Sequence, residues 1–159
     1  LFFNMLNYVN KVNAADQAVK TCRINVNAAA RNVREMALNP DKSTYDDYEQ
    51  GAKEKLEDVD VQLKTIKKSG IVPEDQYNEY SKALSDWANI GYSIMDKIKA
   101  GQKDEAVDQI INECTPKLNK TVELAKEINK LTDERSHQAV VRTYVCAAVG
   151  LIENRKDRA

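Results

Sequence analysis

Histidine, glycine and proline are scarce in this chain of 159 residues. Its five glycines and three prolines cannot supply the turns that a domain of many short strands requires, which excludes all-β and α/β folds. The single histidine, His137, excludes sites in which several histidines bind one metal, and confines any Ser-His or Cys-His catalytic device to one position. The length corresponds to one ordinary domain. We therefore expect a single all-α module that is not an enzyme.

Cysteine and net charge are also limited. Cys22, Cys114 and Cys146 are too few and too far apart for a disulfide framework or a C-x-x-C metal motif. Packed thiols are the favoured interpretation, and a Cys22–Cys114 bridge is the alternative. The 24 basic and 25 acidic side chains leave a net charge of −1, which gives no long-range attraction to nucleic acid or an anionic membrane. We expect no nucleic-acid partner, no metal and no cofactor.

Four segments with a helical repeat of apolar residues account for most of the chain. The repeat predicts helices at about 2–38, 44–69, 73–100 and 102–152. In the first segment, apolar or small residues alternate at spacings of three and four, a heptad pattern typical of helices that pack side by side: Val12, Ala15, Val19, Cys22, Val26, Ala29, Val33 and Met36.

The segment boundaries carry signals that stop and start helices. The first helix should end at Asn39-Pro40, because the residue before a proline disfavours α conformation. Ser43 and Thr44 offer an N-cap for the second helix, and Gly70 offers a left-handed C-cap at its end. The short connections between segments make neighbouring helices antiparallel. The sequence therefore predicts an up-down-up-down four-helix bundle.

The first and last predicted helices are the longest, so they should overhang the bundle together at one end. Both overhangs are apolar, at 1–6 and 144–152, and each run is shorter than the roughly 18 residues that a membrane span needs. These runs are either packed or frayed helix ends or the stubs of two spans. We expect the bundle to occupy 1–152, followed by a polar tail at 153–159 that resembles appended sequence.

A cationic stripe on the first helix is the strongest candidate for binding. Its members lie within about 80° of one another on a helical wheel: Lys20, Arg23, Asn27, Arg31 and Arg34. The stripe borders the predicted buried face, where side chains can be half desolvated. Because the guanidinium fork matches a carboxylate, the stripe suits a small organic anion. The alternative is a solvated face that pairs with the acidic second helix.

Counting heights along antiparallel helices brings further residues to the same level. Pro116 lies inside the last predicted helix, where it removes a backbone hydrogen bond and should produce a kink. Carbonyl groups freed there, with the Thr115 hydroxyl, are available to a ligand. An alternative assigns the one tryptophan to the core and makes Gly91 a relief of crowding beside it. The predicted ligand site comprises Arg23, Asn27, Arg31, Arg34, Thr115, Asn119 and Trp87.

The remaining polar residues indicate no chemistry. His137 lies in a polar stretch and is expected at the surface, and the carboxylates of Glu57, Asp58 and Asp60 fit a solvated helix face. The sequence contains no glycine-rich phosphate loop, C-x-x-C-H haem motif or G-x-S-x-G elbow. We expect no catalytic residues.

Taken together, these features resemble the four-helix-bundle sensor domain of methyl-accepting chemotaxis proteins. The resemblance extends from about Asn4 to Tyr144, in helix lengths, loop positions, the overhanging helices, the Pro116 break and the apolar termini. The stretch from Thr21 to Asn25 is similar to the part of helix one that carries the first ligand-binding arginine in amino-acid chemoreceptors, at Arg23 here. The two further arginine positions of those receptors fall on Ala28 and Asn32.

The resemblance implies a sensor outside the cytoplasmic membrane, periplasmic or extracellular, attached through flanking segments. It implies a homodimer that packs through the first helix, and a ligand, an organic anion or amino acid-like molecule, bound between the first and last helices. Displacement of the last helix would then signal across the membrane. A structural or adaptor bundle without a small ligand, and the same sensor on a histidine kinase or cyclase, remain the alternatives.

Overall fold

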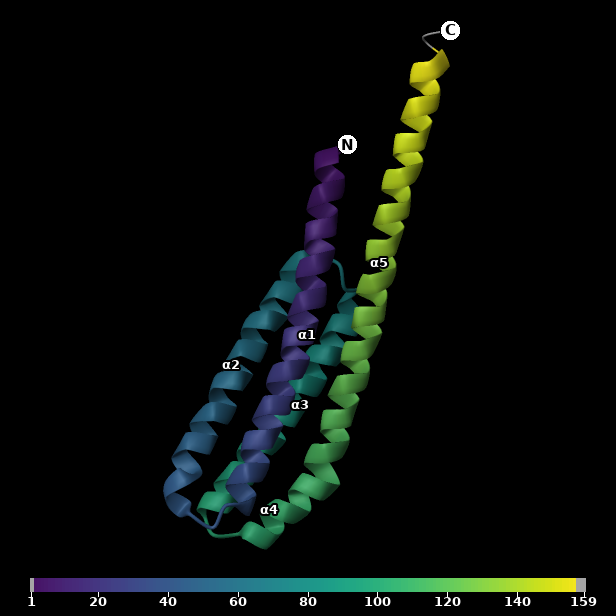
Figure 1. Cartoon of the computed structure of the whole chain (residues 1–159). Helices are drawn as coiled ribbons and strands as arrows, with labels where there is room; N and C mark the ends of the chain where they lie inside the picture. The colour runs from purple at the N-terminus through teal and green to yellow at the C-terminus, as the bar shows by residue number, and fades with distance from the viewer. Residues whose placement is uncertain (1, 157–159) are drawn as a thin grey trace.

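The computed structural model describes residues 2–156, and all of its regular structure is helical. Two long helices, α1 (Phe2–Leu38) and α5 (Thr115–Lys156), overhang the shorter α2 (Tyr45–Ser69) and α3 (Glu74–Lys99) at the end that carries both termini (Figure 1). A short helix, α4 (Lys103–Gln109), leads into α5. The predicted antiparallel bundle with long first and last helices is confirmed.

The connection between α1 and α2 corrects the predicted cap. A 3-10 turn at Lys42–Thr44 precedes α2, and the Asp41 carboxylate caps that turn by accepting from the Ser43 N–H at 2.9 Å. Thr44 directs its hydroxyl to the Asp41 carbonyl at 2.7 Å and makes no side-chain cap for α2. Thr44 therefore occupies the predicted N-cap position of α2, but the side-chain cap expected of Ser43 and Thr44 is wrong, because both hydroxyls bond to Asp41 in the preceding turn.

A π-helical turn, η2 (Ile110–Cys114), joins α4 to α5 immediately before Pro116. The Ile110 carbonyl accepts from the Thr115 N–H, and the Thr115 hydroxyl donates to the same carbonyl at 2.9 Å. A π turn takes in one additional residue, which accommodates the proline without ending the helix. The Thr115 proton expected to be available to a ligand is thus already engaged within the helix.

The core follows the heptad pattern predicted for α1, since all eight predicted positions are buried. The most extensive contact is between α1 and α2, followed by α1 with α5 and α3 with α5, whereas α2 and α3 contact each other much less. Trp87 and Tyr80 are the largest side chains that are fully buried. Buried residues outside the predicted patterns include Ala18 and Ala30 on α1, Met95 on α3, and Leu124 and Ala139 on α5.

The overhanging end of α5 leaves its apolar side chains in solvent. The exposed large residues there are Val140, Val141, Tyr144, Val145, Val149, Leu151 and Ile152. Across residues 2–156, no helix contains a stretch that is long and apolar enough to cross a bilayer. The helix continues to Lys156, so the first part of the expected polar tail at 153–159 is helical, and 157–159 lie outside the described residues.

Candidate functional site

Three of the predicted ligand residues lie in one concavity on α1. This concavity of about 510 Å³ is shallow, and its lining residues all belong to the same helix: Lys20, Arg23, Ile24, Asn27 and Arg31. We call this set the cationic strip. Arg23 is half-buried, whereas Asn27 and Arg31 are exposed. The Asn27 amide donates to the Arg23 carbonyl at 2.8 Å.

The two arginines of the cationic strip have no carboxylate partner. Among the ion pairs within residues 2–156, neither Arg23 nor Arg31 takes part. The ion pairs with acidic α2 that the alternative expected are therefore not found among the described residues, whereas the solvated face that it also expected agrees with the exposure of Asn27 and Arg31. Two guanidinium groups with free donors on one face form a surface to which an anion can bind without displacing an internal partner.

The other four predicted residues do not line this concavity. Asn119 is exposed on α5, and the Thr115 hydroxyl donates within its own turn. Arg34 is half-buried and lies near the Cys114 thiol. Trp87 is only 1% exposed and belongs to the core, as the alternative for this residue held.

The predicted alignment of α1 with α5 is also corrected. Asp16 contacts Asn129 and Thr132 across the two antiparallel helices. With equal rise along both helices, Arg31 comes roughly level with Thr115, whereas Arg23 lies about two turns away from that level. The π turn therefore cannot face the whole strip, which explains why the structure separates Thr115 from Arg23.

The buried thiols are structural. Cys22 and Cys114 are buried and free, so the alternative of a bridge between them is wrong and the packed-thiol prediction is confirmed for both. Burial raises the pKa of the Cys22 thiol to about 12, and burial also raises the pKa of Cys114 against the opposing effects of the Trp87 indole and Arg34. A thiol held protonated in this way is a poor nucleophile and a poor metal ligand. Cys146 and His137 are both exposed.

Gly91 does not relieve crowding beside Trp87, so that interpretation is wrong. A Cβ atom built at this buried glycine meets no atom within 4 Å. The space beside Gly91 is open enough for a methyl group. The indole Nε1 of Trp87 has no hydrogen-bond partner within the described part of the chain.

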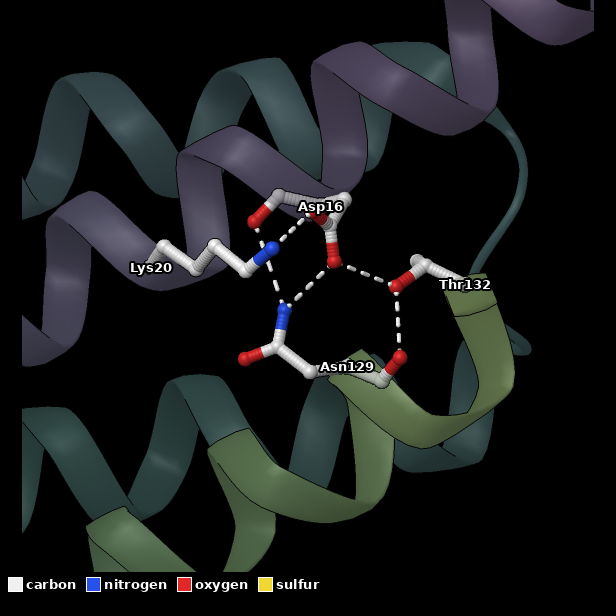
Figure 2. A network of polar contacts seen from close by, with 4 residues as sticks. All are labelled: Asp16, Lys20, Asn129 and Thr132. Carbon is white, nitrogen blue, oxygen red and sulfur yellow. Dashed lines mark hydrogen bonds and ion pairs between the residues drawn. The ribbon is translucent and has the colours of Figure 1, made fainter. Parts of the chain in front are cut away.

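A polar cluster that the sequence analysis missed joins α1 to α5 (Figure 2). One carboxylate oxygen of Asp16 accepts from the Asn129 amide at 2.8 Å and from the Thr132 hydroxyl at 2.7 Å. The other accepts from Lys20 Nζ at 2.6 Å. We call these four residues the Asp16 cluster. Nothing in the sequence linked Thr132 or Asn129 to an acid more than a hundred residues earlier.

Electrostatics favour the charged form of Asp16. Burial is the largest influence on its pKa and would raise it, but the hydrogen bonds from Lys20, Thr132 and Asn129 together outweigh burial and lower the pKa. The charged lysine adds to the lowering. Because Lys20 also lines the cationic strip, this lysine connects the strip to the contact between α1 and α5.

A comparison with known protein families identifies the kind of module that this chain forms. Residues 8–143 match the sequence model of a family described as a four helix bundle sensory module for signal transduction. The chain belongs to this family. Neither a curated protein nor a solved structure matches the sequence of this chain. The matched range contains the cationic strip, the Asp16 cluster and the π turn, so all three lie within the sensory module itself.

The family is one of signalling modules and not typically of enzymes. Among residues 2–156 there is no group of three or more His, Cys, Asp or Glu side chains placed to hold a metal ion. The cationic strip presents positive charge and hydrogen-bond donors to which a ligand can bind.

Proposed function

We propose that this sensory module is the extracytoplasmic ligand-binding domain of a bacterial chemoreceptor, and that it binds a small organic anion at the cationic strip. The observation that carries the proposal is that Arg23 and Arg31 line one concavity without a carboxylate partner. A carboxylate that accepts charge-assisted hydrogen bonds from these two arginines replaces water there, because neither arginine gives up an internal ion pair. Free amino acids carry the same carboxylate and fall in the same ligand class.

The strip also favours a ligand with some hydrocarbon. Ile24 lies between the polar members and is 68% exposed, although it is large and apolar. A carboxylate that carries a short apolar body covers this side chain while its charged end meets Arg23 or Arg31. A bare inorganic anion gains nothing from Ile24. We therefore expect organic carboxylates to bind more tightly than chloride or sulfate of the same concentration.

A single helix cannot enclose the ligand, which supports a homodimer that packs through α1. Small-molecule sites usually bury roughly 70% or more of the ligand's surface. Here every residue that lines the concavity belongs to one face of α1. A second copy that packs along α1 supplies the missing wall. The exposed Ile24 lies on the face that such a contact would cover.

Signalling is proposed to pass to α5 through Lys20. A bound anion competes with Asp16 for the Lys20 ammonium, which alters the hydrogen bonds from Asp16 to Asn129 and Thr132 on α5. A ligand shifts such an equilibrium only by the difference in its affinity for the two arrangements. Replacement of Asp16 by Asn releases Lys20 to the ligand, so Asp16→Asn is expected to tighten anion binding several-fold. If calorimetry shows the same affinity for Asp16→Asn and wild type, Lys20 does not couple the bound anion to α5.

Attachment to a membrane at the overhanging end is part of the same proposal. The exposed apolar side chains of α5 gather at the end of the molecule where α1 and α5 stand beyond the bundle (Figure 1). Displacement of α5 along its axis reaches that end directly, because α5 runs there as one helix from the π turn. Ångström-scale shifts of this kind are sufficient to change a packed interface between helices.

The test is a thermal-shift screen followed by calorimetry. The screen uses acetate, succinate, citrate, benzoate and the common amino acids, and a concentration-dependent rise in melting temperature marks binding to the native state. The strongest compound is then titrated into wild type, Arg23→Ala and Arg135→Ala. Arg135 is an exposed arginine of α5 outside the strip and serves as the matched control.

We expect Arg23→Ala to weaken binding roughly tenfold or more, since a hydrogen bond between charged groups contributes about 1.5 to 3 kcal/mol. Arg135→Ala should bind like wild type. Equal affinity in all three proteins would refute the site, and a screen without any stabilising compound would favour a structural bundle without a small ligand.

A further inference from the structure

A second concavity lies between α2 and α3, with a floor supplied by α1. Its volume is about 340 Å³. We call it the α2–α3 groove. Its lining comprises Val26 from α1, Leu56, Val59, Asp60 and Leu63 from α2, and Ser81, Leu84, Ser85, Ala88, Asn89 and Tyr92 from α3. It shares no residue with the cationic strip.

The groove exists because α2 and α3 pack against α1 and α5 more closely than against each other. Its floor is apolar and belongs to the core: Val26, Leu56, Val59, Leu63 and Leu84 are all buried. Water over such a floor is easily displaced by hydrocarbon. The volume is near the lower end of ordinary ligand pockets, which range from roughly 300 to 1,000 Å³. A helix about 10 Å across does not fit in that space.

The rim of the groove is polar and carries one charge, that of Asp60. Within residues 2–156, Asp60 forms no ion pair. In the same part of the chain, no side-chain hydrogen bond involves the polar rim residues Ser81, Ser85, Asn89 and Tyr92. The polar groups of these side chains are therefore available for hydrogen bonds to a ligand. Neighbouring Glu57 and Asp58 do not line the groove.

We propose that the α2–α3 groove binds a small amphipathic amine, with its apolar body on the floor and its ammonium group at Asp60. Asp60, the charged residue of the lining, favours a cationic group in the ligand. The apolar floor favours a hydrocarbon or aromatic body next to that group. The hydroxyl oxygens of Ser81 and Ser85 and the side-chain carbonyl oxygen of Asn89 are the acceptors available to the two remaining ammonium hydrogens. Tyr92, which is 37% exposed at the rim, offers the face of its ring to the same cation. The ligand class is thus opposite in charge to that of the cationic strip.

Phenethylamine is the probe, because it combines a ring with one ammonium group. Phenylacetate and 2-phenylethanol serve as matched compounds in which the ammonium is replaced by a carboxylate or a hydroxyl. Each is titrated into wild type, Asp60→Asn, Ala88→Leu and Glu57→Gln, with calorimetry for affinity and amide chemical shifts for location. Glu57→Gln removes a carboxylate of the same helix that does not line the groove.

Phenethylamine is expected to bind wild type and Glu57→Gln, and to bind Asp60→Asn roughly tenfold or more weakly, because a charged hydrogen-bond pair is lost. Ala88→Leu fills part of the groove and should also weaken binding, and the shifts should gather on the lining residues of α2 and α3 and on Val26 of α1. The two matched compounds should bind more weakly than the amine. Absence of binding to wild type, or equal binding to wild type and Asp60→Asn, overturns the proposal.

The outcome is separable from that of the anion site. Arg23→Ala should leave phenethylamine affinity unchanged, since Arg23 does not line the groove. Amide shifts that spread along α1 alone would place the amine outside the groove and also overturn the proposal. A change of sedimentation coefficient on adding the amine, with no site-specific shifts, would assign the groove to contact between two copies.

Discussion

Two polar clusters follow each other along α1, and they differ in whether their charges are paired. The Asp16 cluster is closed: the Asp16 side chain is 14% exposed and its carboxylate accepts hydrogen bonds from Lys20, Asn129 and Thr132. The cationic strip is open, because Arg23 and Arg31 lie toward solvent without an acidic partner. The paired carboxylate of Asp16 stabilises the contact between α1 and α5. The unpaired guanidinium groups of the strip can instead form ion pairs with a ligand.

The comparison also assigns a double position to Lys20. It belongs to the closed cluster through its 2.6 Å contact with Asp16 and to the open strip through its place in the lining. Its own contribution to stability should be small, because an exposed ion pair one helical turn apart contributes about 0.3 to 0.5 kcal/mol. Each variant below tests whether the two clusters really divide stability from binding in this way.

The largest effect is expected from Asp16→Ala. Loss of the carboxylate leaves the largely buried amide of Asn129 with only the backbone carbonyl of residue 16, at 3.3 Å, and the Thr132 hydroxyl with only the backbone carbonyl of Asn129. The free energy of unfolding should fall by about 2 to 4 kcal/mol. Urea denaturation followed by circular dichroism measures the change. Lys20→Ala is the control and should cost less than about 1 kcal/mol.

The pH dependence of stability should come partly from the same carboxylate. The pKa of Asp16 in the folded chain lies below its ordinary value of 3.8, so its stabilising contribution is present above that value and is lost as the pH falls through the folded pKa. Wild type and Asp16→Asn should differ in stability at neutral pH and converge as the pH falls toward about 2. Glu49, whose pKa is lowered by hydrogen bonds from Lys53 and Lys99, leaves a residual slope in the variant. A gap that stays constant with pH would contradict this assignment.

Gly91→Ala provides a calibration from the apolar core, away from both clusters. The glycine is in the interior of α3, and an added Cβ meets no atom within 4 Å. Alanine restricts the unfolded chain and removes a poor helix former, so the variant should be more stable by about 0.5 to 1 kcal/mol. Thermal unfolding measures the gain. A loss of stability would show that the space beside Gly91 is occupied in solution.

The smallest effect on stability is expected from Arg23→Ala and Arg31→Ala. Neither arginine takes part in an ion pair of the described chain, and substitutions at such exposed or half-exposed positions usually change the free energy of unfolding by less than about 0.5 kcal/mol. The same urea titrations used for Asp16→Ala provide the measurement. A loss of 2 kcal/mol or more, roughly the size of a broken buried contact, would place these arginines in the fold and remove the contrast.

The bundle was predictable from sequence because a heptad pattern defines which face of each helix is buried, whatever that helix packs against. Val12 to Met36 illustrates this, since spacing alone identified a continuous buried stripe. The Asp16 cluster was not predictable, because it depends on the height at which α5 meets α1. The same unknown height placed Thr115 beside Arg23, and the π turn before Thr115 adds a residue which no periodicity records.

The candidate site was predictable only in part for a related reason. Arg23, Asn27 and Arg31 belong to one helix, so their common face follows from helical geometry. Arg34, Trp87 and Asn119 required knowledge of how three helices sit against each other. Asp60 seemed to be an ordinary solvated acid, because the α2–α3 groove beside it arises from packing distances between helices.

The central claim is that the arginines of the cationic strip receive a carboxylate. Side-chain Nε–Hε resonances of arginine report this most directly, in protein labelled with ¹⁵N-arginine and titrated with the carboxylate that stabilises it most in the thermal-shift screen. The account predicts saturable shifts of the Arg23 and Arg31 signals at one common dissociation constant, with Arg135 unmoved. Signals of Arg23 and Arg31 that stay in place while the protein is saturated, or that move only as much as Arg135, would contradict it.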